Sequence, residues 1–452
     1  MNSKKYDVVI LGKGFKAMIV AYAATKLKKK ILVISDSSNF FGTMGELNWN
    51  EENFDLGYQF FDGLDTSTKK ILHDFVGEEN LTDLGYGAGS YTNGNLEKYH
   101  ALPYWPHMGK LFIFSATLNL IINFIKYHLF KNKSKIVSLE DLYDQLPLNI
   151  NNILKKASVR NFNLEPKKLS WLACDFTPFA EFRQTLFSEK VSLFLKNNFE
   201  YFSKTLATKR RALKLDCISL YPYKKNMNFI AKLMYEKLNK YGVEFYQNIN
   251  YNVKNNKNNN ISVIVDDTEI QCENIYFCED LDKLISLLNF NQSLNQSIHY
   301  VSQVIFLFSQ NKIYSDLQYV HGNDLNINVN RVSNISLYSK TLKNNDSVLI
   351  AEVPCNKNSK IWNEPEIYTD QIWKELQMMK VASPEEKYKD YKIIKLKKTF
   401  PIPLVNYTAN LETIKKYLSD NFNNKFRIPG IEVIGRHDYI KSICKDDYLN
   451  LS

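Results

Sequence analysis

The sequence lacks the motifs that mark several large enzyme classes. No two of its six cysteines form a close CxxC pair, and no cluster of cysteines and histidines has the spacing of a zinc site, so no metal site is predicted. It contains no HExxH motif, no P-loop and no recognisable Ser-His-Asp set. The N-terminus also lacks the apolar core and cleavage site of a signal peptide. Together with the absence of a disulfide pattern, this favours a reducing, cytoplasmic location.

Composition is that of an ordinary globular protein with an excess of positive charge. The 452 residues suffice for two or three domains, and hydrophobic and charged residues make up 44% and 23% of them. Lys and Arg number 58 against 48 Asp and Glu, a formal net charge of +10. The abundance of Lys and Asn favours codon bias over a nucleic-acid surface, so no nucleic-acid partner is expected. The positive balance suits an anionic or phosphorylated small molecule, or a membrane surface.

The N-terminal segment carries the pattern of a dinucleotide-binding unit. The apolar run YDVVILG predicts a buried parallel strand, and Gly12, Gly14 and Ala17 follow it in a G-x-G-x-x-A arrangement. Gly12 permits a tight turn, Gly14 lets the backbone approach a pyrophosphate, and Ala17 lets the next helix, near residues 17–27, pack close to the strand. A second apolar strand ends at Asp36, where a carboxylate usually binds ribose hydroxyls.

This unit predicts dinucleotide binding, and the alternative is a Rossmann-like unit that has lost its ligand. The contacts expected from it are Gly12, Gly14, Phe15, Lys16, Ala17, Asp36 and Ser37.

The segment that follows, SDSSNFFGTMGELNWNEENFDLGYQFFDG, resembles the second part of a flavin fingerprint. That fingerprint belongs to the superfamily of amine oxidases, protoporphyrinogen oxidases and UDP-galactopyranose mutases. Asp36 matches its acid, Gly42 its second loop glycine, and Asp55 and Gly57 its D-x-G element. The resemblance implies FAD as the cofactor, because this loop wraps the FAD pyrophosphate and ribityl chain. The residues it adds to the expected contacts are Gly42, Thr43, Met44, Gly57, Tyr58 and Gln59.

The fingerprint is altered in places. Phe41 and Thr43 stand where the family usually has Gly and Arg, and Gln59 stands where His is common. The first change affects the phosphate contacts. The second removes the basis for carrying over a role for that side chain.

Two further segments resemble the same superfamily. LYPYKKNMNFIAKLMYEKLNKYGVEFYQNINYNV is similar to its mid-chain segment, in which the backbone at the position of Val253 usually holds the adenine. At the C-terminus, GIEVIGR resembles the strand that returns to the flavin, with Gly435 and Arg436 beside it. KDDYLNL resembles the start of the last helix, whose amides usually face the flavin, and Asp447 is the residue expected there.

The fold implied is α/β, a Rossmann-like FAD-binding domain of the GR2 type with a mixed α+β substrate domain. Residues 1–84, 220–290 and 401–452 are expected to form the FAD-binding domain. Residues 85–219 would form a mainly helical part of the substrate domain. Residues 291–400 would add an antiparallel sheet and a helix to it.

Three functions are compatible with this resemblance. The first is an FAD-dependent oxidoreductase in which a small-molecule substrate passes hydride to flavin N5, with Arg436, Tyr407 and Gln59 as candidate catalytic residues. The second is a flavin-dependent mutase acting on a nucleotide sugar, which the positive charge also suits. The third is a non-catalytic protein of the same fold, like the Rab GDP-dissociation inhibitors, which bind no flavin. The sequence makes no prediction of oligomeric state.

Residues 111–130, LFIFSATLNLIINFIKYHLF, are about as long as a membrane span. Asn119, Asn123, Lys126 and His128 interrupt the apolar run, so we expect a buried helix of the substrate domain. The alternatives are a helix that lies in a membrane surface and makes the protein membrane-associated, and, least favoured, a true span.

Overall fold

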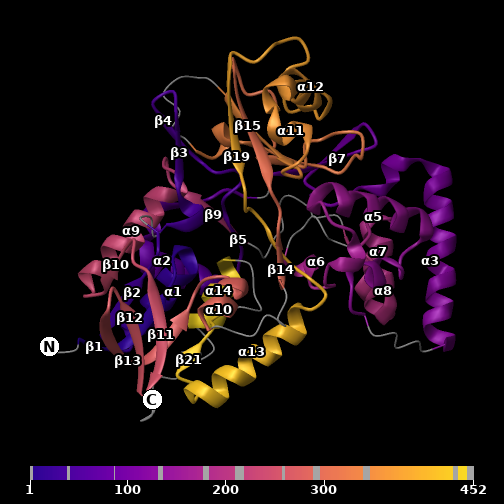
Figure 1. Ribbon diagram of the computed structural model, residues 1–452. Coiled ribbons are helices and arrows are strands. Elements are labelled where there is room, and N and C mark those ends of the chain that lie inside the picture. The colour runs from indigo at the N-terminus through magenta and orange to yellow at the C-terminus, as the bar shows by residue number, and fades with distance from the viewer. Residues whose placement is uncertain are drawn as a thin grey trace. The chain divides into compact units, whose positions relative to one another are not determined.

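The computed structural model divides the chain into two compact units (Figure 1). Unit 1 consists of Met1–Leu84, Asp216–Ser297 and Asn406–Ser452, and unit 2 of Gly85–Leu215 and Ile298–Val405. The residues that the structure describes are 4–37, 41–85, 87–130, 136–176, 183–208, 218–256, 260–288, 296–339, 347–430 and 436–444.

Unit 1 is built on a seven-stranded sheet with helices packed beside it. Its strands are β1 (Lys5–Leu11), β2 (Ile31–Ile34), β10 (Glu244–Tyr246), β11 (Tyr251–Asn256), β12 (Asn260–Val265), β13 (Thr268–Phe277) and β21 (Phe426–Arg427). Its helices are α1 (Gly14–Lys26), α2 (Thr66–Val76), α9 (Met227–Lys240), α10 (Leu281–Leu287), α13 (Tyr407–Phe422) and α14 (Arg436–Cys444). Smaller elements are η1 (Gly42–Met44), β3 (Glu46–Trp49), β4 (Glu52–Asp55), β5 (Phe61–Leu64), η2 (Glu78–Asn80), β6 (Leu81–Asp83) and β9 (Ile218–Pro222).

The parallel strands of this sheet run in the order β10-β2-β1-β13-β21. Numbered along the chain, that order is 3-2-1-4-5, which is the order of the dinucleotide-binding α/β fold. β1 lies in the middle, and Val8, Val9, Ile10 and Leu11 are fully buried, because parallel strands with neighbours on both sides and helices beside them exclude water. The α/β class expected from the sequence is therefore correct for this unit.

Unit 2 combines a second seven-stranded sheet with a group of helices. The sheet runs β19-β15-β18-β17-β16-β7-β8 and is antiparallel except where β16 pairs with β7. Its strands are β7 (Ala88–Thr92), β8 (Asn95–Lys98), β15 (Gln303–Gln310), β16 (Tyr319–Gly322), β17 (Arg331–Asn334), β18 (Ser347–Pro354) and β19 (Asp390–Leu396). A separate pair joins β14 (Ile298–Tyr300) to β20 (Pro401–Pro403).

The helices of unit 2 belong to two hydrophobic cores. One face of the sheet packs against α12 (Thr369–Met378) through Phe306, Phe308 and Trp373. The other core is helical. The remaining helical elements are η3 (Trp105–Met108), α3 (Lys110–Phe130), α4 (Leu139–Tyr143), α5 (Leu148–Phe162), η4 (Pro166–Lys168), α6 (Ala173–Phe176), α7 (Glu189–Asn198), α8 (Glu200–Thr205), η6 (Ile335–Leu337), α11 (Lys360–Asn363) and η7 (Pro365–Tyr368).

One expectation about burial and one about secondary structure are wrong. Residues 111–130 form α3 as expected, but that helix is not a buried one. It is long and apolar enough to cross a membrane, with a mean hydropathy of 1.3, and only 11% of its most apolar window is buried. At the C-terminus, Arg436 is the first residue of helix α14, whereas we expected it at the end of a strand. The helix start expected in KDDYLNL stays a prediction. Residues 445–452 lie outside the described residues.

Candidate functional site

The glycine turn after β1 has the backbone that the motif requires. Gly12 and Gly14 have φ values of +134° and +79°, in the region that side chains with a Cβ rarely adopt. A Cβ on Gly12 would lie 3.0 Å from the carbonyl carbon of Cys278, at the end of the neighbouring strand β13. The Gly12 amide donates to the carbonyl of Ile34, which joins the turn to β2. The turn is therefore held between its two neighbouring strands in a conformation that suits glycine.

Helix α1 begins at Gly14, earlier than the sequence suggested, so its first turn contains Gly14, Phe15 and Lys16. The N-cap residue, Lys13, makes no side-chain cap, and this first turn contains no acidic residue. The first amides of a helix have no partner within the helix and carry a partial positive charge, so such a terminus suits an anion.

The second glycine loop lies directly against this turn. A Cβ on Gly42 would lie 3.1 Å from the Cα of Gly14, and Gly42 has a φ of +58°. Met44 of the same short helix η1 is fully buried, whereas Thr43, which stands where the family has Arg, is exposed. Two glycine backbones therefore meet at the start of α1, in a cradle that side chains at either position would fill.

The side chains of the first turn point in different directions. Phe15 is buried with its ring 5.4 Å from that of Phe61, and Ala17 is buried against the sheet. Lys16 lies 5.7 Å from the ring of Tyr439 on α14. Burial lowers the pKa of Lys16, while the nearby Glu279 raises it. The net effect is a lowered pKa, so burial works against the charge of Lys16.

Asp36 follows β2 as expected, and it has a partner that the sequence did not suggest. Its carboxylate accepts a hydrogen bond of 2.8 Å from Lys283 of α10. Although burial opposes it, the hydrogen bond and charge of Lys283 lower the pKa of Asp36, so the carboxylate stays ionised. The next residue, Ser37, donates its amide to the Ser35 hydroxyl. Asp36 is exposed and has a second oxygen that can accept from a ligand hydroxyl.

Asp55, the acid of the D-x-G element, is a buried structural group. Its two oxygens accept from the Tyr221 hydroxyl at 2.5 Å and from the Met227 amide at 2.9 Å, which fixes the start of α9. Burial raises the pKa of Asp55 to about 6, even though both hydrogen bonds and the charge of Arg436 lower it. The acid of the D-x-G element therefore joins β4 to β9 and α9, besides leading into the loop that follows β4.

The raised pKa of Asp55 predicts a pH-dependent loss of stability. Its pKa is about 6 in the folded chain and 3.8 in the reference state, so the folded chain binds this proton more tightly. Stability falls as pH rises from about 4 to about 6, by about 3 kcal/mol in total for a shift of this size. Asp55→Asn should remove that loss, measured by urea unfolding of both cofactor-free proteins across this range.

Asp36→Asn is the control for this titration. The pKa of Asp36 is lowered, so its stabilisation is present above the reference pKa and is lost as pH falls. Removal of the Asp36 carboxylate should therefore change the pH dependence of the free energy of unfolding in the opposite direction. Parallel profiles for wild type and Asp55→Asn would contradict the assignment.

The loop after β4 and the start of α14 are joined by Arg436. Gly57 has a φ of +83°, and Tyr58 donates to Asp62 at 2.8 Å. Arg436 donates to the carbonyl of Phe60 at 2.8 Å and to the side-chain oxygen of Gln59. Burial lowers the pKa of Arg436 to about 10, which leaves it charged at neutral pH. Two of the three candidate catalytic residues, Gln59 and Arg436, are thus brought together.

The other expected site residues lie elsewhere or outside the described residues. Tyr407 is buried in the first turn of α13. Val253 lies in β11, at the end of the sheet order, paired with Val263. Gly435 and Asp447 lie outside the described residues. The binding and catalytic roles expected for all of these residues stay predictions.

The arrangement has counterparts among solved structures. A protein assigned as a protoporphyrinogen oxidase from Exiguobacterium sp. 255-15 matches with a TM-score of 0.68 and 12% identity, over 100% of this chain and 99% of that one. Reduced UDP-galactopyranose mutase matches with a TM-score of 0.72 and 13% identity, over 99% and 96%. Putrescine oxidase bound to putrescine matches with a TM-score of 0.63 and 12% identity, over 99% and 98%. The chain has the amine oxidase-like fold. No family model and no curated protein matches the sequence.

At this level of identity the likeness shows the amine oxidase-like fold alone, so the fit of a dinucleotide rests on the residues present. The uncapped amides of α1 and the paired backbones of Gly14 and Gly42 suit two phosphates. Asp36 stands where a ribose can be bound. These residues fit FAD.

A row of polar side chains crosses the sheet of unit 2, and sequence reasoning missed it. Residues in register across neighbouring strands share one face, and here they are Glu352, Arg331, His321, Ser90 and Glu97. They lie on the face opposite the one that packs on α12. The signal was present, because Glu352 stands in the otherwise apolar strand SVLIAEVP.

The row is held by strong interactions. Arg331 donates to both oxygens of Glu352 at 2.9 Å each, and both residues are buried. His321 is buried beside them, and burial, with the charge of Arg331, lowers the pKa of His321 to about 3, so it is neutral at physiological pH. The side-chain nitrogen of Gln303 and the hydroxyl of Ser333 are buried on the same face without a hydrogen-bond partner among the described residues. This face therefore combines a buried ion pair with buried polar atoms that lack a hydrogen-bond partner.

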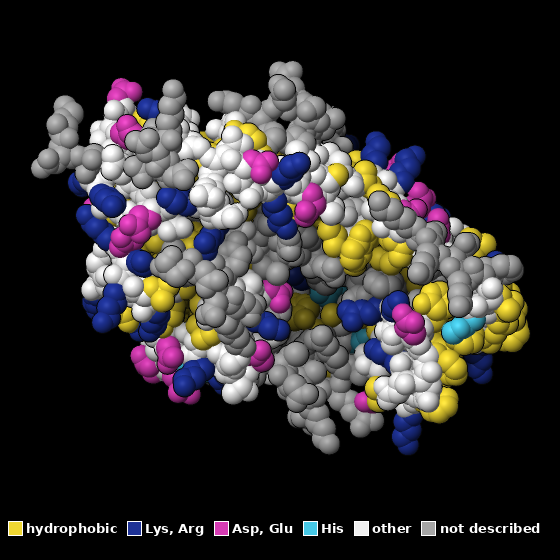
Figure 2. All heavy atoms as spheres, turned by 90° about the horizontal axis from the view of Figure 1, so that it is seen from below, with side chains coloured by type: hydrophobic (Ala, Val, Ile, Leu, Met, Phe, Trp, Pro, Cys, Tyr) yellow, Lys and Arg dark blue, Asp and Glu magenta, His cyan; other side chains and the backbone are white. Residues whose placement is uncertain are grey.

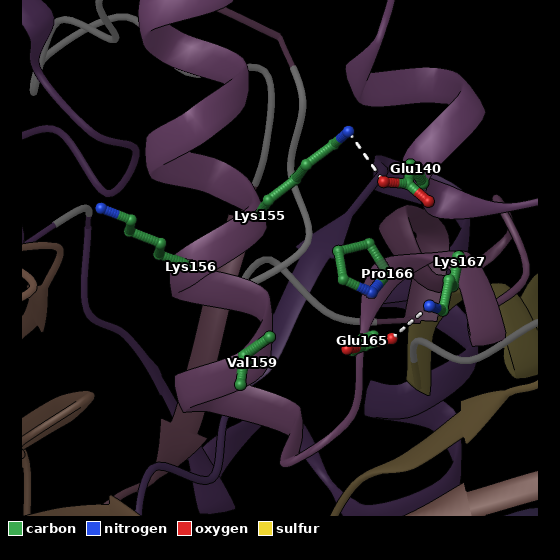
Figure 3. Close-up of a pocket in the computed structure, with 7 residues that line it drawn as sticks. All are labelled: Glu140, Lys155, Lys156, Val159, Glu165, Pro166 and Lys167. Carbon is green, nitrogen blue, oxygen red and sulfur yellow. Dashed lines mark ion pairs between the residues drawn. The ribbon is translucent and has the colours of Figure 1, made fainter.

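A surface hollow of about 440 Å³ lies on another part of unit 2, between α5 and η4 (Figure 3). Lys155 reaches Glu140 at 2.8 Å and Lys167 reaches Glu165 at 2.8 Å, so two of its cations are already paired. Lys156 points away from them. We assign no function to this hollow.

Proposed function

We propose that the chain is an FAD-dependent oxidoreductase of the amine oxidase and protoporphyrinogen oxidase type, acting on a small polar molecule. The observation that carries this proposal is the meeting of two glycine backbones, Gly14 and Gly42, at the uncapped start of α1. A turn this tight around free helix amides suits a diphosphate.

The residues of unit 1 have distinct parts in this proposal. The first amides of α1 hold the diphosphate, Lys16 lies in the same turn, and Asp36 accepts from the ribose hydroxyls. Arg436 holds the Gln59 loop in place from the start of α14. When bound, FAD supplies a two-electron acceptor, which the side chains of the protein lack.

We assign substrate binding to the polar row of unit 2. The buried donor of Gln303 and the hydroxyl of Ser333 can pair with a polar substrate, and the Arg331–Glu352 pair keeps the row rigid. Neutral His321 can accept or donate a hydrogen bond without adding charge.

The spectrum of the purified protein tests the proposal. We expect the visible absorption of oxidised flavin, and FAD as the molecule that mass spectrometry identifies after release by acid. Anaerobic addition of candidate amines or other small reductants should bleach that absorption. A colourless protein that releases no dinucleotide, even after incubation with FAD, would instead support the non-catalytic function.

A mutase function is the second candidate. The TM-score of 0.72 with UDP-galactopyranose mutase and the net charge of +10 favour it. Activity on a nucleotide sugar that requires prior reduction with dithionite would support it over the oxidoreductase. An oxidoreductase should turn over in the oxidised state and release a product that has lost two electrons.

A further inference from the structure

Helix α3 presents a continuous apolar face to solvent. Its exposed large hydrophobic residues, with their exposed fractions, are Leu111 (87%), Phe114 (70%), Leu118 (49%), Ile121 (47%), Ile122 (41%), Ile125 (47%) and Leu129 (70%). Their spacing of three and four places them on one side of the helix. The space-filling view shows hydrophobic side chains gathered over this part of unit 2 (Figure 2). Isolated exposed hydrophobic residues are ordinary, but a stripe along a helix of 21 residues marks an interaction surface.

The opposite side of α3 is packed into unit 2. Ala116 and Leu120 are buried, and the Phe124 ring stacks on that of Phe202 at 4.9 Å. The Asn123 side chain donates to the carbonyls of Gln145 and Leu146. Because the helix is attached along its length to the rest of the unit, it cannot cross a bilayer by itself, and only its outer face is available.

Helix α7 of the same unit also exposes hydrophobic residues. Val191, Leu193 and Phe194 are exposed by 46%, 43% and 63%. Phe199, which follows α7, lies 5.4 Å from Phe124 of α3. Exposed hydrophobic residues of unit 2 are therefore not confined to α3.

Charge around α3 indicates what covers this surface. From residue 110 to residue 139 the sequence contains no Asp or Glu, and it contains Lys110, Lys126, Lys131, Lys133 and Lys135. In a symmetric dimer each of these lysines would meet the same positive patch of the second copy, which is unfavourable. An anionic lipid surface offers apolar chains to the stripe and negative headgroups to the lysines.

We propose that α3 lies flat in the surface of an anionic membrane, with its outer face among the lipid chains and its lysines at the headgroups. The protein is then a monotopic one, attached through unit 2. This inference does not depend on the cofactor or the reaction of the proposed function. The membrane inference and the proposed function can therefore be disproved independently of each other.

Vesicle sedimentation with the full-length protein tests the inference. We expect the protein to sediment with vesicles of phosphatidylcholine and phosphatidylglycerol, and less with phosphatidylcholine alone, and high salt should weaken the binding. The variant Phe114→Gln/Ile121→Gln/Ile125→Gln keeps good helix formers on the outer face. It should reduce the partition coefficient at least about tenfold.

The matched control replaces exposed hydrophobic residues elsewhere in unit 2. Ile313, Ile367 and Val405 are exposed by 44%, 57% and 39%, so their joint replacement by Gln removes similar surface away from α3 and should leave binding unchanged. Circular dichroism checks that both variants fold.

Two results would overturn the inference. One is wild-type protein that stays in the supernatant with both kinds of vesicle. The other is a dimer, found by analytical ultracentrifugation without lipid, that the α3 variant abolishes, because a second copy would then be what covers this face.

Discussion

Gly14→Glu should abolish retention of FAD while the chain still folds. The substitution places a carboxylate at the start of α1, where the proposal puts two phosphates, and like charges repel. The φ of +79° at Gly14 adds a strain of about 1–2 kcal/mol. A Cβ there would still lie 3.7 Å from Gly42, so the fold can accept it. We expect the affinity for FAD to fall about 100-fold or more, measured by the flavin content after gel filtration.

The same substitution at Gly242 separates the loss of the phosphate site from backbone strain. Gly242 belongs to unit 1 and has a φ of +82°, and nothing lies within 4 Å of a Cβ built on it. Gly242→Glu should therefore cost similar stability and keep its FAD. If Gly14→Glu retains FAD as well as Gly242→Glu does, the phosphate site is not at this turn.

The unit around the glycine turn could be predicted because its signals are local. The apolar runs of β1 and β2 and the glycines between them lie in one short segment, where strand, turn and helix follow from spacing alone. Even here the helix begins at Gly14, three residues earlier than Ala17.

The contacts that complete the site could not be predicted in this way. Lys283 pairs with Asp36 across 247 positions of sequence. A single sequence does not indicate which lysine will pair with Asp36. The polar row of unit 2 depends on register between five strands, which only the folded sheet determines.

The prediction that residues 111–130 form a buried helix was wrong for a different reason. Its polar residues suggested a buried helix of the substrate domain. In the structure, however, Asn123 faces inward to the carbonyls of Gln145 and Leu146, and the outer face carries the apolar residues. Hydropathy alone does not tell which side of an apolar helix meets the protein.

Breaking the Arg331–Glu352 pair should have the largest effect on stability. Arg331→Met leaves a buried carboxylate with neither of its two hydrogen bonds from the guanidinium, at a site where Glu352 is 2% exposed. Removal of one partner of a buried ion pair typically costs about 3–5 kcal/mol. We expect a loss of that size in the free energy of unfolding, measured with urea on cofactor-free protein.

The double variant Arg331→Met/Glu352→Leu separates structure from function, because replacing both charges with apolar groups is often neutral for stability. We expect it to recover most of the stability lost in Arg331→Met, and to bind FAD normally, since both residues belong to unit 2. It should react more slowly than wild type with the small molecules that bleach wild-type flavin, because the pair no longer keeps the polar row rigid. Wild-type rates in the double variant would show that the pair serves packing alone and has no part in substrate binding.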